Sequence, residues 1–251
     1  MAKDKKKSLG RIRNIGIMAH IDAGKTTLTE RLLFITGRIH RMGEVHEGQA
    51  AMDWMPQEQE RGITITSAVT TFEWENVEVH LIDTPGHVDF TMEVERSLRV
   101  LDGVITVLDA VAGVEPQTET VWTQADRFNV PRLVFVNKMD KMGASFERSV
   151  KSLEDHFGDR WGIVPLQIPI GEEGGHVGVV DLIEMKAMTW DGTDPALVEI
   201  TDIPESLQEA AVSGRASMLE KLSDISDDIA MFFLEGEPVP NELILEVVRE
   251  G

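Results

Sequence analysis

The chain has 251 residues, of which 42% are hydrophobic and none is cysteine. This length suits one large domain, or one domain with a sizeable insert, and the composition excludes a disordered chain, a disulfide and a thiolate metal site. No stretch approaches the roughly 18–20 apolar residues that span a membrane, and the basic residues 1–7 precede no apolar segment of a secretory signal. We therefore expect a soluble, cytoplasmic protein.

The net charge of −20 is concentrated in the last third of the chain. Residues 161–251 contain 19 Asp and Glu against 4 Lys and Arg, a net of −15, and the first 160 residues carry only −5. An acidic surface is most often simply solvated, but it also suits a face that meets a basic partner, and it disfavours contact with RNA phosphates. The change of composition near residue 160 predicts two domains, 1–160 and 161–251.

The first 160 residues alternate between strand-like and helical segments, which predicts an α/β domain with a mostly parallel sheet flanked by helices. The expected strands are 13–19, 66–74, 77–83, 103–110 and 132–137. The expected helices are 25–36, 117–128 and 144–157. Only Glu75 and Asn76 separate the second strand from the third, as in a tight hairpin.

Two regions have a less regular pattern. Residues 37–62 are polar and show no clear period, and a connection of that length is usually functional. After residue 160, three glycines surround short apolar segments that end at residues 179–183, and the pattern becomes helical over 204–235. We expect this part to form a smaller α/β subdomain.

A phosphate-binding loop is predicted where the first strand ends and the first helix begins. The spacing is that of a Walker A loop, with Ala19 in place of the first glycine. Backbone N–H groups of such a loop and the helix N-terminus surround a β-phosphate. Lys25 can bridge the β- and γ-phosphates, and Thr26 can ligate Mg²⁺. The residues assigned to the loop are Ala19, His20, Ile21, Asp22, Ala23, Gly24, Lys25, Thr26 and Thr27.

A second group of candidate residues follows the strand 77–83. Asp83, at the strand end, can hold Mg²⁺ directly or through water, and Gly86 can bring its backbone N–H against a γ-phosphate. A lone histidine is more often an ordinary surface or core residue. The position of His87 directly after Asp-Thr-Pro-Gly favours a catalytic role in orienting the attacking water. The whole group is Asp83, Thr84, Pro85, Gly86 and His87.

The long polar connection ends in Ile63, Thr64 and Ile65. In isolation these residues are equally typical of the start of a strand. Behind such a connection, Thr64 is predicted to complete the Mg²⁺ shell only when a γ-phosphate is present, as in a nucleotide-dependent switch. The residues assigned to the metal are therefore Thr26, Thr64 and Asp83.

A base-binding motif is predicted after the strand 132–137. It consists of Asn137, Lys138, Met139 and Asp140. The Asp140 carboxylate can accept two hydrogen bonds from guanine, whereas adenine lacks that pair of donors and would leave the carboxylate unsatisfied. Asn137 can tie this motif to the phosphate loop, and the stem of Lys138 can stack on the base. Its order after the other motifs indicates a site for GTP.

Together these motifs resemble elongation factor G, a translational GTPase. The resemblance is carried by residues 14–27, 52–68, 83–91, 137–140 and 178–187, and it extends over essentially the whole chain. The stretch 52–65 distinguishes the chain from release factor three, from tetracycline ribosome-protection proteins and from the elongation factor that carries aminoacyl-tRNA. The resemblance implies a P-loop NTPase fold with an inserted subdomain after the base-binding motif.

The resemblance also implies an activity, cofactors and partners. GTP would be hydrolysed to GDP on the ribosome with Mg²⁺, to drive translocation of tRNA and mRNA. Asp22 would contact the phosphates or an accompanying monovalent cation, and Ile21 and Ile63 would form a hydrophobic gate beside His87. The partners would be the factor-binding region of the large subunit and the stalk protein, with nucleic acid met only through ribosomal RNA. The protein would act as a monomer, away from membranes.

The chain departs from this family in one respect. The family's second guanine-binding motif, Ser-Ala, lies beyond the inserted subdomain, and the sequence stops at Gly251 without it. We therefore expect a fragment that binds GTP more weakly than an intact domain. Two alternatives remain for its function: a nucleotide-dependent module that only binds the ribosome, and a relative specialised for ribosome recycling.

Overall fold

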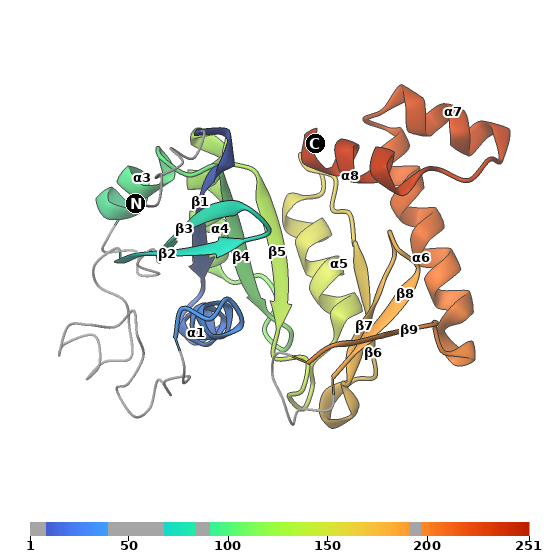
Figure 1. Ribbon diagram of the computed structural model, residues 1–251, viewed down its shortest axis with the longest axis horizontal. Coiled ribbons are helices and arrows are strands. Elements are labelled where there is room, and N and C mark those ends of the chain that lie inside the picture. Colours follow the sequence, from blue (N-terminus) through green and yellow to red (C-terminus); the bar gives the residue numbers. More distant parts are fainter. Residues whose placement is uncertain (1–8, 40–67, 84–90, 191–196, 251) are drawn as a thin grey trace, which may run out of the picture. The chain divides into compact units, whose positions relative to one another are not determined.

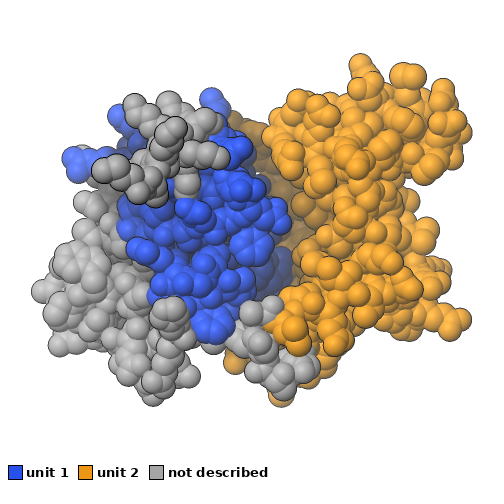
Figure 2. All heavy atoms as spheres, in the orientation of Figure 1, with its two compact units in different colours: residues 1–138 blue, residues 139–251 orange. Residues whose placement is uncertain are grey.

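The computed structural model describes residues 9–39, 68–83, 91–190 and 197–250 (Figure 1). The chain divides into two compact units, residues 1–138 and 139–251 (Figure 2). The predicted domain boundary at residue 160 lies inside the second unit, after its first helix. That boundary refers to the start of an inserted subdomain and stays a prediction.

The first unit is built on a five-stranded sheet with the order β2-β3-β1-β4-β5. Its strands are β1 (Ile12–Ala19), β2 (Ala68–Trp74), β3 (Val77–Asp83), β4 (Gly103–Asp109) and β5 (Arg132–Asn137). Its helices are η1 (Leu9–Arg11), α1 (Lys25–Ile35), α3 (Thr91–Leu98) and α4 (Pro116–Arg127). All neighbouring strands are parallel except β2 and β3, so the predicted, mostly parallel sheet is confirmed.

The predicted hairpin between β2 and β3 is also present. Its two loop residues, Glu75 and Asn76, have φ values of 44° and 72°. Positive φ at both positions is characteristic of the turn whose twist matches that of the flanking strands. The hairpin places β2 at the edge of the sheet, antiparallel to β3.

Alternating side chains of β1 belong to cores on the two faces of the sheet. Met18 packs with residues of α3, β4 and α4, including Leu98, Val104 and Val121. Ile17 and Ala19 pack on the other face with residues of β3, β4 and α1. Because successive side chains of a strand point to opposite faces, the apolar run of β1 supplies both cores. The central strand is thereby packed on both faces, and Ala23 of the loop that follows it belongs to the second of these cores.

The second unit combines a four-stranded antiparallel sheet, β6-β7-β8-β9, with helices. Its strands are β6 (Gln167–Ile170), β7 (Gly178–Asp181), β8 (Lys186–Thr189) and β9 (Glu199–Thr201). Its helices are α5 (Phe146–Phe157), η4 (Glu173–Gly175), α6 (Glu205–Ser223), α7 (Asp227–Glu235) and α8 (Asn241–Glu250). Within the described ranges, no helix is both long enough and apolar enough to cross a lipid bilayer.

The helical pattern predicted over 204–235 is divided between α6 and α7. Residues 224–226 separate them, and the hydroxyl of Ser226 accepts a hydrogen bond of 3.3 Å from the N–H of Ile229. A serine at this position caps the N-terminus of a new helix and satisfies one of its free N–H groups. Both helices contribute to the core of the second unit, through Met218 and Leu222 of α6 and Ile229 of α7.

Arg215 links α6 by hydrogen bonds to two other segments of the second unit. Its guanidinium donates hydrogen bonds to the carbonyls of Leu182 and Ile183, which follow β7. It also donates to the carbonyl of Val239 and to Oδ1 of Asn241, the first residue of α8. Burial lowers the pKa of Arg215, whereas the charges of Glu184 and Asp181 raise it, and the net direction is downward. The group nevertheless stays protonated, because an arginine loses its proton only far above neutral pH.

Replacing Arg215 by methionine is expected to destabilise this unit. The methionine keeps much of the apolar stem but leaves the buried carbonyls without their donor, which costs about 2–3 kcal/mol of unfolding free energy. Urea unfolding followed by circular dichroism measures this loss. Arg249→Met, which changes an exposed arginine of α8, is the control and should lose less than about 0.5 kcal/mol. Equal losses in both variants would contradict the role of Arg215.

Candidate functional site

Four parallel strands of the first unit carry polar residues at the same edge of the sheet. β1 leads into the loop 20–24, β3 ends at Asp83, β4 at Asp109 and β5 at Asn137. The register aligns Ile17 with Asp83 and Asp109 with Asn137. In open α/β sheets, ligands bind outside the carboxyl ends of the strands, where the strand order reverses. Here β1 lies between β3 and β4, so the loop after β1 starts at such a reversal.

The loop 20–24 is folded by its own backbone and by Asn137. The N–H of Ala23 donates to the carbonyl of His20 at 3.1 Å. The side-chain amide of Asn137 donates to the carbonyl of Ala23 at 2.8 Å. Gly24 has a φ of 100°, and a Cβ at this position would lie 2.2 Å from Nδ2 of Asn137. Only glycine therefore allows this approach, and the predicted link between base motif and loop is present.

Lys25 and Asp83 form an ion pair beside this loop. The Nζ of Lys25 lies 2.9 Å from Oδ1 of Asp83, and the two side chains are 11% and 0% exposed. A carboxylate that is fully removed from water needs a cation or several hydrogen bonds to remain charged. The sequence predicts both residues as ligands of one site, and the structure brings them into direct contact.

The remaining residues of the loop differ in exposure and contacts. Ala19 and Ala23 are buried, whereas Asp22 and Thr27 are exposed and Thr26 is half-buried at the start of α1. Asp22 also has a positive φ of 61°, which is uncommon for a residue other than glycine and marks a constrained loop.

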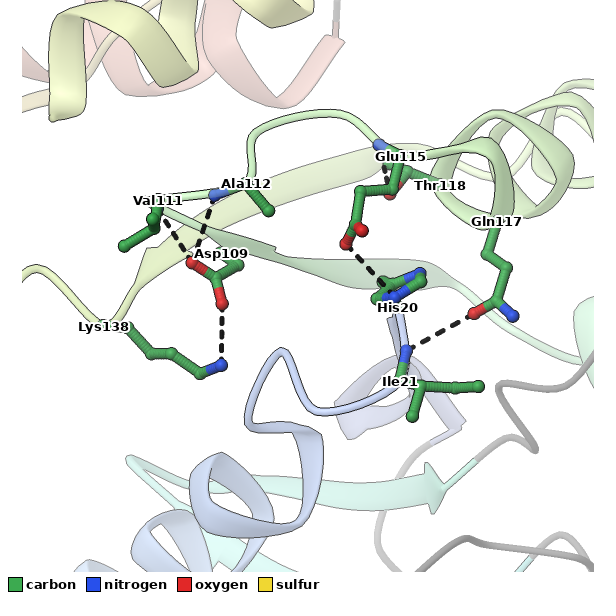
Figure 3. Close-up of polar contacts among 9 residues, drawn as sticks. All are labelled: His20, Ile21, Asp109, Val111, Ala112, Glu115, Gln117, Thr118 and Lys138. Atoms are coloured by element: carbon green, nitrogen blue, oxygen red, sulfur yellow. Dashed lines mark hydrogen bonds and ion pairs between the residues drawn. The ribbon is translucent and has the colours of Figure 1, made fainter. Parts of the chain in front are cut away.

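Two side chains at the start of α4 contact the loop 20–24 (Figure 3). One comes from the turn before this helix and the other from its first turn. Oε2 of Glu115 lies 3.3 Å from Nε2 of His20. The side-chain carbonyl of Gln117 accepts a hydrogen bond of 3.4 Å from the backbone N–H of Ile21. Neither Glu115 nor Gln117 belongs to one of the motifs that predict the site from the sequence. Both lie after the fourth strand, and no recognised spacing relates them to the Walker A loop.

Lys138 is held by Asp109, a further residue that lies outside the predicted motifs. Its Nζ donates to Oδ2 of Asp109 at 2.7 Å, while Oδ1 of Asp109 accepts the N–H groups of Val111 at 2.8 Å and Ala112 at 3.4 Å (Figure 3). Lys138 has a φ of 61°. Such a backbone costs about 1–3 kcal/mol and persists only where the surroundings fix it.

The surroundings of Asp109 keep its carboxylate charged. Burial raises its pKa, but the hydrogen bond from Lys138, those from the backbone N–H groups and the lysine charge outweigh this and hold the pKa below the ordinary value of an aspartate. The stabilisation by this ion pair is therefore complete above the ordinary pKa of an aspartate and is lost as the pH falls through the lower, folded-state value. The contact is intact at neutral pH.

The other predicted site residues are placed as follows. Met139 is buried and Asp140 is exposed, and both belong to the second compact unit. Ile63, Thr64, Thr84, Pro85, Gly86 and His87 lie outside the described residues. Their assignments stay predictions.

The described residues fit a nucleotide with its magnesium ion. The tight loop ends at Gly24, at the N-terminus of α1, where no side chain caps the helix. Helix N-termini of this kind attract anions such as phosphate. Asp83 offers a buried carboxylate oxygen and Thr26 a hydroxyl, which are ligands that Mg²⁺ prefers.

A family model described as the elongation factor Tu GTP binding domain matches residues 10–236 of this chain. The chain belongs to that family. Its members are GTP-binding domains by description, and the match covers both the phosphate loop and the base-binding motif. The predicted P-loop GTPase fold, with a mostly parallel sheet flanked by helices and an additional subdomain, is confirmed.

Two relatives of this GTP-binding domain cover nearly the whole chain. Elongation factor G 2 from Syntrophus aciditrophicus (strain SB) is 56% identical over 247 residues, which is 98% of this chain and 36% of that protein. A crystal structure of a protein from Thermus thermophilus superposes with a TM-score of 0.86 at 31% identity and covers 96% of this chain and 36% of that one. The predicted resemblance to elongation factor G is confirmed. The chain spans about a third of the length of these relatives.

Proposed function

We propose that this chain binds GTP and GDP and hydrolyses GTP in contact with the ribosome, as the catalytic part of a factor that drives translocation of tRNA and mRNA. The observation that carries the proposal is the contact between Lys25 and Asp83 at the carboxyl edge of the sheet. In P-loop GTPases, a lysine and an aspartate in these positions serve the phosphates and the magnesium ion.

Lys25 would hold the β- and γ-phosphates, together with the backbone of the loop 20–24. Thr26, Thr64 and Asp83 would hold Mg²⁺, which neutralises charge on the phosphates when bound. For Lys25 and Asp83 this means an exchange of partners, because each now neutralises the other. The exposed carboxylate of Asp22 is available to a monovalent cation or to the edge of the phosphate site.

For hydrolysis we assign His87 to orient the attacking water, with Ile21 and Ile63 flanking it. The nucleotide would also meet Thr84, Pro85 and Gly86. This assignment rests on the order of the motifs and on the similarity to elongation factor G. Phosphoryl transfer depends mainly on positioning and on charge stabilisation, so a single well-placed histidine has a large effect on the rate.

The ribosome and its stalk protein are the proposed partners. The support is the similarity to elongation factor G 2 and the acidic surface of residues 161–251, which suits a basic protein partner better than RNA. RNA would be met only as part of the ribosome. We further propose that the protein acts as a monomer in the cytoplasm, where its partner is found.

Single-turnover hydrolysis of GTP, with and without ribosomes, tests the proposal. We expect slow hydrolysis by the chain alone and a rate increase of at least a hundredfold with ribosomes, because activators of GTPases raise the rate by about 10³–10⁵. GTP-dependent binding to ribosomes without any rate increase would mean that the chain is only a binding module. No binding of GTP or GDP would refute the proposal altogether.

Guanine recognition by Asp140 gives a separate prediction. Asp140→Asn exchanges the carboxylate that accepts two hydrogen bonds from guanine for an amide that matches xanthine better. We expect the preference for GTP over xanthosine triphosphate to fall by about 10²-fold or more, as for other sites that read a base through paired hydrogen bonds. Competition binding of the two nucleotides measures it. Lys151→Gln, which changes an exposed lysine of α5, is the control, and an unchanged preference in Asp140→Asn would reject the assignment.

A further inference from the structure

Asp109 is a charged residue at the nucleotide edge of the sheet for which the GTP-binding motifs provide no role. It is the last residue of β4, its side chain is 16% exposed, and it lies outside the phosphate loop and the Asn-Lys-Met-Asp motif. One carboxylate oxygen meets Lys138 at 2.7 Å and the other caps the turn that follows β4 (Figure 3). The carboxylate thus connects the ends of two neighbouring strands.

The partner of Asp109 is the one residue of the base motif whose backbone is left-handed. Lys138 has a φ of 61°, and its Nζ would otherwise end a flexible stem of four carbons. The two strands that carry the pair are aligned residue by residue up to Asp109 and Asn137, and the N–H of Ala110 continues the ladder to the carbonyl of Asn137 at 2.9 Å. Both ends of the contact are therefore fixed by the sheet.

We propose that Asp109 is a positioning residue of the base site: its carboxylate holds the ammonium group of Lys138 and so fixes the stem on which the guanine would stack. This inference rests on the proposed function. A stem that is already ordered before the base binds loses no further rotamer freedom on binding, and that cost otherwise weakens the affinity. The pair also leaves the lysine charge neutralised, so that its methylene groups can face the ring.

The substitution Asp109→Asn separates this role from the capping of the turn. The asparagine keeps a carbonyl oxygen for the N–H groups of Val111 and Ala112, but it places an amide with no negative charge against Lys138. We expect the Kd for GDP, measured by calorimetry in the presence of Mg²⁺, to rise about threefold to tenfold, as for the freeing of one long side chain in a binding site.

A double-mutant cycle with Lys138→Met provides the decisive comparison. Methionine keeps an apolar stem but has no ammonium group for Asp109 to hold, so Asp109→Asn should have no further effect on GDP affinity in that background. Asp202→Asn is the matched control, because it removes the carboxylate from another lysine pair of 2.7 Å, between Lys186 and Asp202 of the second unit. This control should bind GDP as the unchanged chain does.

The results that decide the proposal are as follows. A weakened affinity that disappears in the Lys138→Met background supports the proposal. An unchanged affinity in Asp109→Asn, or the same loss in both backgrounds, overturns it while the GTP-binding function stands. Failure of the unchanged chain to bind GDP would refute the proposed function, and this inference with it.

Discussion

Replacing Lys25 by alanine is expected to weaken GDP and GTP binding by about 10²- to 10³-fold, the range found when one partner of a buried, hydrogen-bonded charge pair is removed. The affinity falls because the phosphates lose the cation that would bridge them. The fully buried carboxylate of Asp83 also loses its ion-pair partner at 2.9 Å, and this affects the stability of the nucleotide-free chain. Calorimetric titration with GDP and Mg²⁺ measures the change in affinity.

The same variant should also be less stable without any nucleotide. Removing one member of a buried ion pair costs about 3–5 kcal/mol, because the remaining charge stays out of water. Lys186→Ala is the control: it breaks a contact of 2.7 Å with Asp202, but the two side chains are 48% and 94% exposed, so the loss should be below about 1 kcal/mol. The double variant Lys25→Met with Asp83→Leu should recover stability but not GDP affinity.

The affinity measurement can contradict our placement of the phosphates. It does so if Lys25→Ala binds GDP with an affinity within a few-fold of that of the unchanged chain.

Replacing His87 by alanine is expected to lower ribosome-stimulated hydrolysis by about three orders of magnitude and to leave GDP affinity nearly unchanged. The reason is that a residue orienting the attacking water acts on the transition state and contributes little to binding of the ground state. Single-turnover rates at saturating ribosome concentration measure the first effect, and calorimetry measures the second.

His156→Ala provides the comparison for this variant, since His156 is an exposed histidine of α5 whose ring contacts the carbonyl of Ser152 in its own helix. It should hydrolyse GTP at the rate of the unchanged chain. Normal stimulated hydrolysis in His87→Ala would mean that another group orients the water. A parallel loss of GDP affinity would instead place His87 in ground-state binding.

The strands of the first unit could be predicted from the sequence because their apolar runs are long and bounded by polar residues. β3 and β5 have the predicted limits, and β1 differs by one residue. The strands of the second unit have only three or four residues, too few for a period to be recognised. α3 was not predicted either, because eight residues with mixed polarity provide little more than two turns of pattern.

The candidate site likewise contains some residues that can be predicted from the sequence and others that cannot. Lys25, Asp83 and Asn137 were predicted to act together because each belongs to a motif with fixed spacing, and the structure brings Lys25 to Asp83 and Asn137 to the loop. Asp109 was missed because a single aspartate after an apolar strand has no such spacing. Its role depends on which strand lies beside β4, and only the order of strands in the sheet provides that information.

The hydrogen bond from Asn137 to the carbonyl of Ala23 has a consequence for how the protein is made. It joins residues 114 positions apart in the chain. At roughly 5–20 residues per second, synthesis of the intervening segment takes on the order of ten seconds. During that time the nascent chain already contains the phosphate loop but lacks the strand that secures it. Contacts of such long sequence separation form late in folding. Tight nucleotide binding should therefore begin only after β5 has emerged and joined the sheet.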